Sequence, residues 1–122
     1  MMEKIRTLGQ QRSEFALKKV MENQNLTSLK PFSAGAPSMI LQNGFGQALA
    51  FWAAKGKNEH NTLFDIIRDW FNIYNTKFKS ADQKEFLEKI SQSSQEEYFI
   101  LQNEALQLLE WVKRYANAFI KG

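Results

Sequence analysis

The sequence predicts an all-α protein, a compact bundle of about five helices that ends in a long C-terminal helix. Two observations lead to this prediction: apolar residues recur at three- and four-residue steps over most of the chain, and no stretch shows the alternation typical of a strand. Of the 122 residues, 43% are hydrophobic and 13% aromatic, a content typical of a globular chain rather than a disordered one. At this length we expect a single helical domain spanning residues 1–122.

The first third of the chain is predicted to hold one helix and a linker. Apolar residues at helical spacing predict the first helix from about residue 3 to 22. A linker over about residues 25–37 is expected to join it to the second helix, because this stretch contains three residues that break regular structure: Pro31, Gly35 and Pro37.

The middle of the chain is predicted to form two amphipathic helices. The second helix is expected from about residue 38 to 54, with Gly56 as its C-terminal cap. The third helix is expected from about residue 61 to 75, where Asn61 or Thr62 can cap the N-terminus. Both helices should bury a broad apolar face in the core.

The last third is predicted to form a short and a long helix. Ser80 begins a segment with the form of a capping box, which predicts the fourth helix over about residues 80–90. Ser94 and Glu97 form a second capping box before the fifth helix, expected over about residues 95–120. At 1.5 Å per residue this helix spans about 38 Å, so it should cross the whole domain.

The most unusual segment is Asn43-Gly44-Phe45-Gly46-Gln47, which lies within the second predicted helix. Each glycine inside a helix costs roughly 1 kcal/mol relative to alanine, so two glycines at this spacing require an explanation. One explanation is a close helix–helix crossing, where glycine lets another backbone approach. The other is that the exposed amides of Asn43 and Gln47 meet a nucleic-acid backbone or a neighbouring subunit. The two are compatible, because both amides share a narrow polar strip on the helical wheel.

Two segments of the chain resemble a known family. The first is the glycine-bearing segment, which runs into a helix rich in alanine and phenylalanine. The second is segment 104–116, where Leu-Leu-x-Trp-x-Lys-Arg is followed by an aromatic residue and an alanine. Both are similar to segments, in the same order, of the small subunit of the type III-B CRISPR Cmr (RAMP module) RNA-guided effector complex.

The resemblance implies a non-enzymatic helical subunit that stacks beside a guide RNA in antiviral defence. The implied partners are other Cmr effector subunits, including copies of this chain, together with the CRISPR RNA and the target RNA. Contact would be with nucleic-acid backbones, since base pairing supplies the sequence specificity. The alternative is a helical protein–protein adaptor with no direct nucleic-acid contact. A small DNA-binding regulator ranks behind both, because no helix–turn–helix signature with a basic recognition helix is present.

The distribution of charge indicates where RNA contact is expected. Residues 1–80 carry eleven Lys and Arg against six Asp and Glu, a balance of +5, whereas residues 81–122 carry five against seven, a balance of −2. This asymmetry favours contact with a polyanion on one side. The candidates for contact with an RNA backbone are Arg12, Lys18, Lys19, Asn43, Gln47, Lys55, Lys57, Arg68, Lys113 and Arg114. The candidates for contact with a neighbouring subunit are Gly44, Gly46 and Trp111.

Three of these candidates occupy unusual positions on their predicted helices. Arg12 and Lys19 fall at the centre of an apolar stripe, and burying an unpaired charge there is prohibitive. Either they extend to the edge of the stripe, or an acid from the fourth or fifth helix pairs with them, or the stripe faces a groove that holds a phosphate. Arg12 is the first choice as a functional cation, because arginine matches phosphate geometry bidentately. Trp111 lies off the main stripe of the last helix, either as a satellite core contact or as an exposed anchor for another protein.

The residues contain no recognisable catalytic or metal-binding set. Cysteine is absent, and the only histidine, His60, is expected to cap a helix or face solvent. No His/Asp/Glu spacing suggests a metal site, and the glycine-bearing segment lacks the lysine of a phosphate-binding loop. We therefore expect no enzymatic activity, cofactor or small-molecule substrate. The sequence also lacks a transmembrane run and an apolar signal core, so a cytoplasmic location without membrane contact is expected.

Overall fold

The computed structural model describes residues 5–122, and within this range the protein is all-α, with no strand. It confirms the predicted fold class and the long C-terminal helix. The described elements are the α-helices α1 (Leu8–Glu22), α2 (Leu29–Asn43), α3 (Phe45–Lys55), α4 (Asn58–Tyr74), α5 (Gln83–Gln92) and α6 (Gln95–Phe119), and the short 3-10 helix η1 (Thr76–Phe78).

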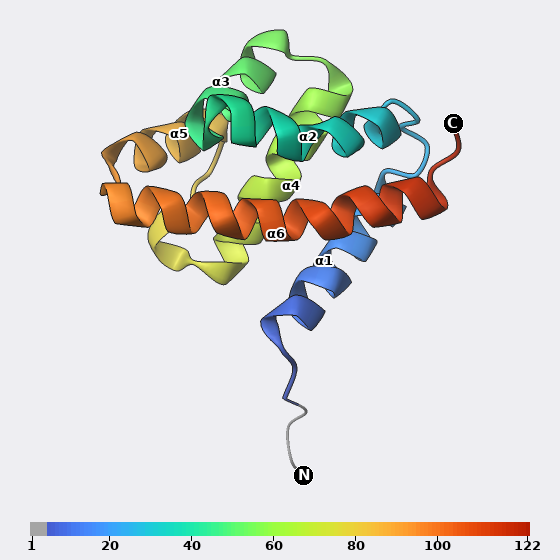
Figure 1. The fold of residues 1–122 in the computed structure, drawn as a ribbon, viewed down its shortest axis with the longest axis horizontal. Coiled ribbons are helices and arrows are strands. Elements are labelled where there is room, and N and C mark those ends of the chain that lie inside the picture. Colours follow the sequence, from blue (N-terminus) through green and yellow to red (C-terminus); the bar gives the residue numbers. More distant parts are fainter. Residues whose placement is uncertain (1–4) are drawn as a thin grey trace.

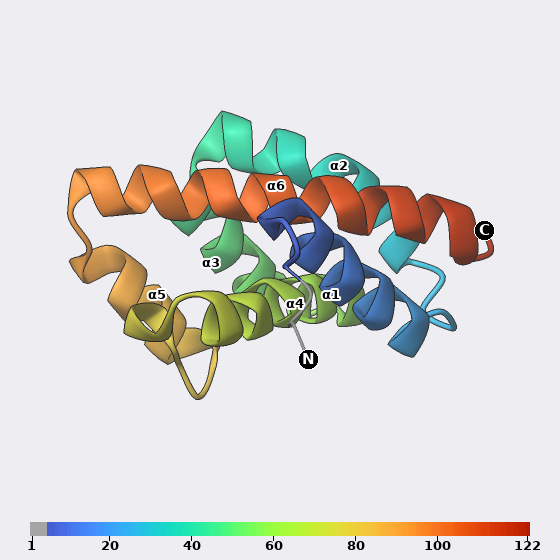
Figure 2. The ribbon, with the colours of Figure 1, turned by 90° about the horizontal axis from the view of Figure 1, so that it is seen from below.

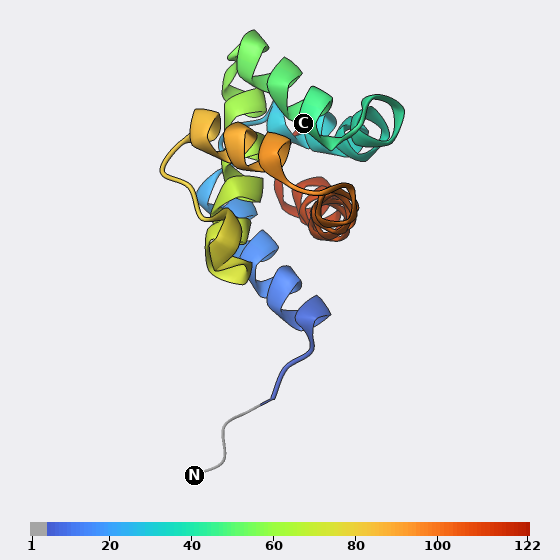
Figure 3. The same cartoon turned by 90° about the vertical axis from the view of Figure 1, so that its left-hand side faces the viewer.

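The long helix α6 organises the bundle. It runs across the whole width of the molecule, with α2 alongside it and α1 crossing it (Figure 1). Turned by 90°, the molecule shows α2 on one side of α6 and α1, α4 and α5 on the other (Figure 2). Viewed nearly along α6, the other helices gather on one side of it (Figure 3), so that one side of α6 is left free. No helix among the described residues has the length and apolar character needed to cross a membrane.

The predicted linker over residues 25–37 is wrong, because α2 occupies residues 29–43. The first proline is tolerated at the third position of the helix, where a backbone N–H would have no intrahelical partner. The second, Pro37, lies inside the helix and removes one hydrogen bond. Burial outweighs that loss, since four residues on one helical face are buried: Leu29, Ser33, Ala36 and Ile40.

The single helix predicted over residues 38–54 is also wrong, because the chain breaks at Gly44 into α2 and α3. Gly44 has φ 85° and ψ 156°, a backbone conformation that is essentially restricted to glycine. Gly56 ends α3 with φ 64°, in the left-handed region, which confirms the predicted C-terminal cap. The two glycines therefore mark the two ends of α3.

The remaining helix ends differ from the predictions by a few residues. Helix α1 begins at Leu8, after a capping box formed by Thr7; residues 3 and 4 of the predicted helix lie outside the described range. Helix α4 begins at Asn58 rather than Asn61. The cap of α5 is Asp82 and not Ser80. The capping box that Ser94 forms with Glu97 at the start of α6 is confirmed.

The buried residues form a core cluster with an aromatic centre. Phe86 lies between three other phenylalanines, with ring centroids 6.3 Å from Phe45, 6.2 Å from Phe64 and 5.7 Å from Phe71. These four rings come from α3, α4 and α5, so the aromatic centre of the core lies where these three helices pack together. Helix α6 covers one side of the core.

Candidate nucleic-acid interface

Arg12 on α1 is paired with a buried acid on α6. Its Nε and Nη2 donate to the two carboxylate oxygens of Glu104, each at 2.7 Å, and the side chains are only 14% and 5% exposed. Trp70 Nε1 donates to the same carboxylate at 2.9 Å. The hydrogen bond to Glu104 raises the pKa of Arg12, although burial acts in the opposite direction. Of the three arrangements left open for Arg12, the structure supports pairing with an acid from the last helix.

Lys19 is also paired, but its partner comes from another helix than predicted. Its Nζ donates to Asp69 of α4 at 3.1 Å and lies 5.5 Å from the centroid of the Phe15 ring. The expected acid from the fourth or fifth helix is wrong for Lys19, because α1 packs against α4 as well as α6. Lys19 therefore fastens α1 to α4.

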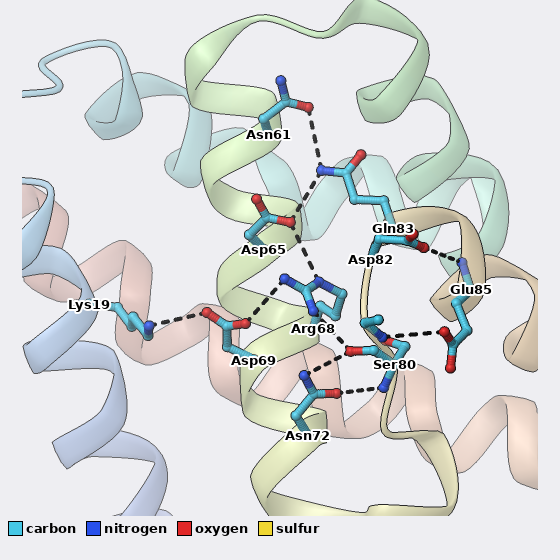
Figure 4. Close-up of polar contacts among 11 residues, drawn as sticks. Lys19, Asn61, Asp65, Arg68, Asp69, Asn72, Ser80, Asp82, Gln83 and Glu85 are labelled. Atoms are coloured by element: carbon cyan, nitrogen blue, oxygen red, sulfur yellow. Dashed lines mark hydrogen bonds and ion pairs between the residues drawn. The ribbon is translucent and has the colours of Figure 1, made fainter.

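Arg68 holds the connection between α4 and α5 in place (Figure 4). Its Nη1 donates to the carbonyl oxygen of Ser80 at 3.0 Å, and its guanidinium lies 3.6 Å from Asp65 and 3.5 Å from Asp69. Asn72 brackets the same residue, donating to the Ser80 carbonyl at 3.1 Å and accepting from the Ser80 N–H at 2.9 Å. The contacts of Arg68 are thus intramolecular and structural.

Two side chains of α6 cap the start of α3, next to the two glycines of the unusual segment. The Phe45 N–H donates to Gln102 Oε1 at 2.9 Å, and the Gly46 N–H donates to the Tyr98 hydroxyl at 2.8 Å. A Cβ on Gly44 would lie 3.3 Å from that hydroxyl. The atoms closest to both glycines belong to the Tyr98 side chain and not to the backbone of another helix, so a close backbone crossing is not supported as the reason for them. Gly44 is explained by its positive φ, whereas a Cβ on Gly46 would make only an ordinary contact, 3.5 Å from the Tyr98 hydroxyl. Sequence analysis did not identify Tyr98 and Gln102 as capping residues. The only signal for this role was their spacing of about one turn on a predicted helix.

Removing the Tyr98 hydroxyl tests this cap. Tyr98→Phe should lower the free energy of unfolding by about 1 kcal/mol, because the Gly46 N–H loses its partner. Tyr74→Phe is the matched control, since the Tyr74 hydroxyl makes no hydrogen bond with residues 5–122; its effect should stay within about 0.5 kcal/mol. Urea denaturation followed by circular dichroism measures both. Equal effects of the two substitutions would show that the hydroxyl does not cap α3.

A second capping contact, at the start of α6, makes the stability of the fold depend on pH. Glu97 closes the capping box at its start, and the hydrogen bond from Lys77, followed by those within the capping box, lowers the pKa of Glu97 below 4.5. The ionised carboxylate therefore stabilises the fold above pH 4.5, and this contribution is lost as the pH falls through the lowered pKa. Glu97→Gln keeps a capping side chain without the charge, so it should reduce the loss of stability between pH 5 and pH 3 (about the range in which a carboxyl titrates). Thermal melts across this range check it, with Glu96→Gln as the neighbouring control; identical pH profiles for Glu97→Gln and the parent chain would contradict it.

Exposed polar and aromatic side chains gather along α3 and at the end of α2. Gln47, Phe51 and Lys55 follow one another at four-residue spacing on α3, and the exposed Asn43 is the last residue of α2; we call these four residues the α3 face. Asn43 and Gln47 line a hollow of about 340 Å³ beside Phe51. The Asn43 side chain donates to the Met39 carbonyl oxygen at 3.1 Å. The Lys55 Nζ lies 5.6 Å from the Phe51 ring centroid, and Lys57 follows just beyond the end of α3.

The structure divides the candidate cations into two groups. Arg12, Lys19 and Arg68 are half-buried and paired within the chain. A second group is exposed and makes no ion pair with any residue from 5 to 122: Lys18, Lys55, Lys57 and Arg114. Lys113 lies between the two groups, since it is half-buried and 3.3 Å from the exposed Glu110. The second group and Lys113 lie on α1, on α3 or just beyond it, and on α6, so they are not gathered into one site.

The two remaining aromatic candidates pack within the chain. Trp111 is half-buried against the core and stacks on Tyr115 with centroids 5.8 Å apart, which agrees with a satellite core contact. His60 lies in the first turn of α4, where its ring is 4.2 Å from Phe32 and its Nδ1 is 3.5 Å from the Glu59 carboxylate. The expected capping or solvent role of His60 is therefore wrong. No cluster of His, Cys, Asp and Glu suited to a metal occurs among the described residues.

The fold and these residues define a small all-helical protein whose accessible candidate residues lie on exposed helix faces. The chain belongs to the Cas_Cmr5 family of CRISPR-associated proteins, whose model matches residues 8–119. This confirms the predicted resemblance to the small subunit of the type III-B Cmr complex.

Comparison with a known sequence and with a solved structure shows the same similarity along nearly the whole chain. The "CRISPR system Cmr subunit Cmr5" of Thermus thermophilus is 28% identical over 120 residues, which cover 96% of this chain and 99% of that protein. The crystal structure of a CRISPR-associated Cmr5 family protein from Thermus thermophilus superposes with a TM-score of 0.81 at 27% identity, over 95% of this chain and 100% of the other.

Proposed function

We propose that this protein is a non-catalytic small subunit of a type III-B CRISPR RNA-guided effector complex. It stacks with copies of itself along the assembly and helps to hold guide and target RNA through backbone contacts in antiviral defence in the cytoplasm. Family membership supports the assembly. The observation that supports the RNA contact is the exposed group of cations, which keep their charge free of ion pairs with the described residues, together with the amides of the α3 face.

The α3 face suits the backbone of a nucleic acid better than its bases. Lysine ammonium groups neutralise phosphates without selecting a sequence, and the side-chain amides of Asn43 and Gln47 donate to phosphate or ribose oxygens. Such contacts recognise charge and shape, while pairing between guide and target supplies the sequence. Because each copy offers only a few cations, an isolated copy should bind RNA weakly, and repetition along the stack should supply avidity.

Neutralising the lysines at the end of α3 tests the RNA contact. In the reconstituted complex, Lys55→Ala with Lys57→Ala should weaken target-RNA binding, because two phosphate contacts are lost in every copy. The slope of log K against log salt should become less negative by about 1 for each lysine that meets a phosphate. Fluorescence anisotropy at four salt concentrations measures the slope.

The control removes the same charge elsewhere. Lys79→Ala with Lys121→Ala alters two exposed lysines, one just beyond η1 and one just beyond α6, which make no ion pair with residues 5–122, and should leave the slope unchanged. If both double variants assemble normally and bind target RNA like the parent complex, the contact through Lys55 and Lys57 is wrong. The alternative, a protein–protein adaptor without nucleic-acid contact, would then be favoured.

A further inference from the structure

A groove lies between the start of α2 and the end of α6, where these two segments come together near the C-terminus (Figure 1). We call it the α2–α6 groove. Its volume of about 750 Å³ is in the range of sites that hold small ligands. Its lining includes Ser28, Lys30, Pro31, Ala34, Lys113 and Arg114.

The charge of the α2–α6 groove is one-sided. Lys30 from α2 and Lys113 and Arg114 from α6 line it, and no acidic side chain of residues 5–122 does so. The hollow between α1 and α4 differs, because three acids, Glu22, Asp65 and Asp69, line it together with Lys19. The α2–α6 groove is therefore suited to an anion.

The three cations retain the capacity to bind a ligand. Arg114 is exposed and makes no ion pair with the described residues. The Lys113 Nζ is 3.3 Å from Glu110, an exposed residue that does not line the groove. The Lys30 Nζ is 3.5 Å from the Gly122 carbonyl oxygen, at the long limit of a hydrogen bond.

The backbone at the start of α2 does not supply the anion site. The N–H of Leu29 donates to the Leu26 carbonyl at 3.0 Å, and the N–H of Lys30 donates to the Thr27 carbonyl at 3.2 Å. The next residue, Pro31, has no N–H. Anion binding in the groove would thus depend on side-chain charge, which substitution can remove.

We propose that the α2–α6 groove binds phosphate groups, either of RNA or of a free polyphosphate. The RNA source rests on the proposed function, whereas the free-anion source does not. Arginine and two lysines can share the several charges of a phosphate chain, and arginine can bind two oxygens of one phosphate. An acidic protein segment fits less well, because no aromatic side chain among the described residues lines the groove to anchor it.

Binding to the full chain with two probes tests this proposal. A fluorescently labelled decauridylate reports RNA, and inorganic tripolyphosphate, measured by calorimetry, reports a free anion. Lys30→Ala with Arg114→Ala should lower the affinity for any probe that binds in the groove about tenfold at low salt, because two phosphate contacts are lost. Lys79→Ala with Lys84→Ala, which removes the same charge from the exposed surface in and before α5, should change it less than twofold. Loss of decauridylate binding alone identifies RNA as the ligand, and loss of both probes identifies phosphate groups in general.

Two outcomes would overturn the groove proposal. One is unchanged binding of both probes by the Lys30 and Arg114 double variant, with an unaltered melting temperature. The other is a glutamate-rich peptide that binds the groove when neither phosphate probe does. The Lys55 and Lys57 double variant separates the two proposals: if it loses decauridylate binding while the groove variant keeps the binding of both probes, the groove proposal fails and the RNA contact of α3 stands.

Discussion

Replacing Glu104 with alanine is expected to lower the free energy of unfolding by about 3–5 kcal/mol. Its carboxylate accepts from Arg12 at two oxygens and from Trp70, and the side chain is only 5% exposed. Removing it leaves a half-buried guanidinium and an indole N–H without their partner, which is costly in a poorly solvated site. Since small domains are stable by about 5–15 kcal/mol, this single change removes a large share of the total. Guanidinium chloride denaturation measures it.

An exposed acid on the same helix provides the control. Glu110 lies 3.3 Å from Lys113 at the surface of α6, and Glu110→Ala should cost at most about 1 kcal/mol. Replacing both buried partners, with Arg12→Met and Glu104→Leu, should recover much of the lost stability, because neither charge then remains unpaired. If Glu104→Ala is as mild as Glu110→Ala, the buried pair does not contribute to stability as inferred.

Replacing Gly44 with alanine is expected to destabilise the protein by about 1–3 kcal/mol. The backbone of Gly44, at φ 85° and ψ 156°, is essentially restricted to glycine. The added methyl group would also lie 3.3 Å from the Tyr98 hydroxyl, which caps α3. The substitution therefore strains the break between α2 and α3 and disturbs its contact with α6. Urea denaturation gives the change in the free energy of unfolding.

The control is a glycine in an ordinary helical position. Gly35 lies inside α2, exposed, and a Cβ there would meet nothing within 4 Å. Gly35→Ala should therefore stabilise the protein by up to about 1 kcal/mol. The two substitutions make the same chemical change and are expected to have opposite signs. Stabilisation by both would show that Gly44 does not require its observed backbone conformation.

Long amphipathic helices and their caps could be predicted from sequence. The apolar spacing of α4 and α6 follows directly from the residues each helix buries, and the Ser94–Glu97 capping box and the Gly56 cap are local features. In such segments, local preference and tertiary burial favour the same structure. The prediction of the fold class depended on these segments, whereas the family resemblance depended on the glycine-bearing segment and on residues 104–116 of α6.

The region from residue 25 to 54 could not be predicted in the same way. Two prolines and a glycine indicated a linker, but burial of one face of α2 against α6 outweighs their local preference. Conversely, a continuous apolar pattern concealed the break at Gly44, after which Tyr98 and Gln102 of the distant helix α6 accept from the first N–H groups of α3. Both errors arise because contacts distant in sequence determine the local backbone.

The candidate site was predictable only as a set of residue types. The position of Arg12 and Lys19 in an apolar stripe showed that they needed an explanation, but their partners lie 92 and 50 residues away in the chain. Arg68 gave no signal that it would bind the Ser80 carbonyl. The structure was therefore needed to distinguish the cations that are paired within the chain from those that are exposed. The exposed group consists of Lys18, Lys55, Lys57 and Arg114.

The central claim is that this chain contacts RNA within a Cmr effector complex through exposed helix faces. The most direct measurement is ultraviolet crosslinking of the assembled complex with bound target RNA, followed by mass spectrometry of the crosslinked peptides. We expect crosslinks in peptides that contain the α3 face or Lys57, and none to Arg12 or Arg68, which are held by Glu104 and Ser80. A complex that contains this chain and binds target RNA, but gives RNA crosslinks only to other subunits, would contradict it.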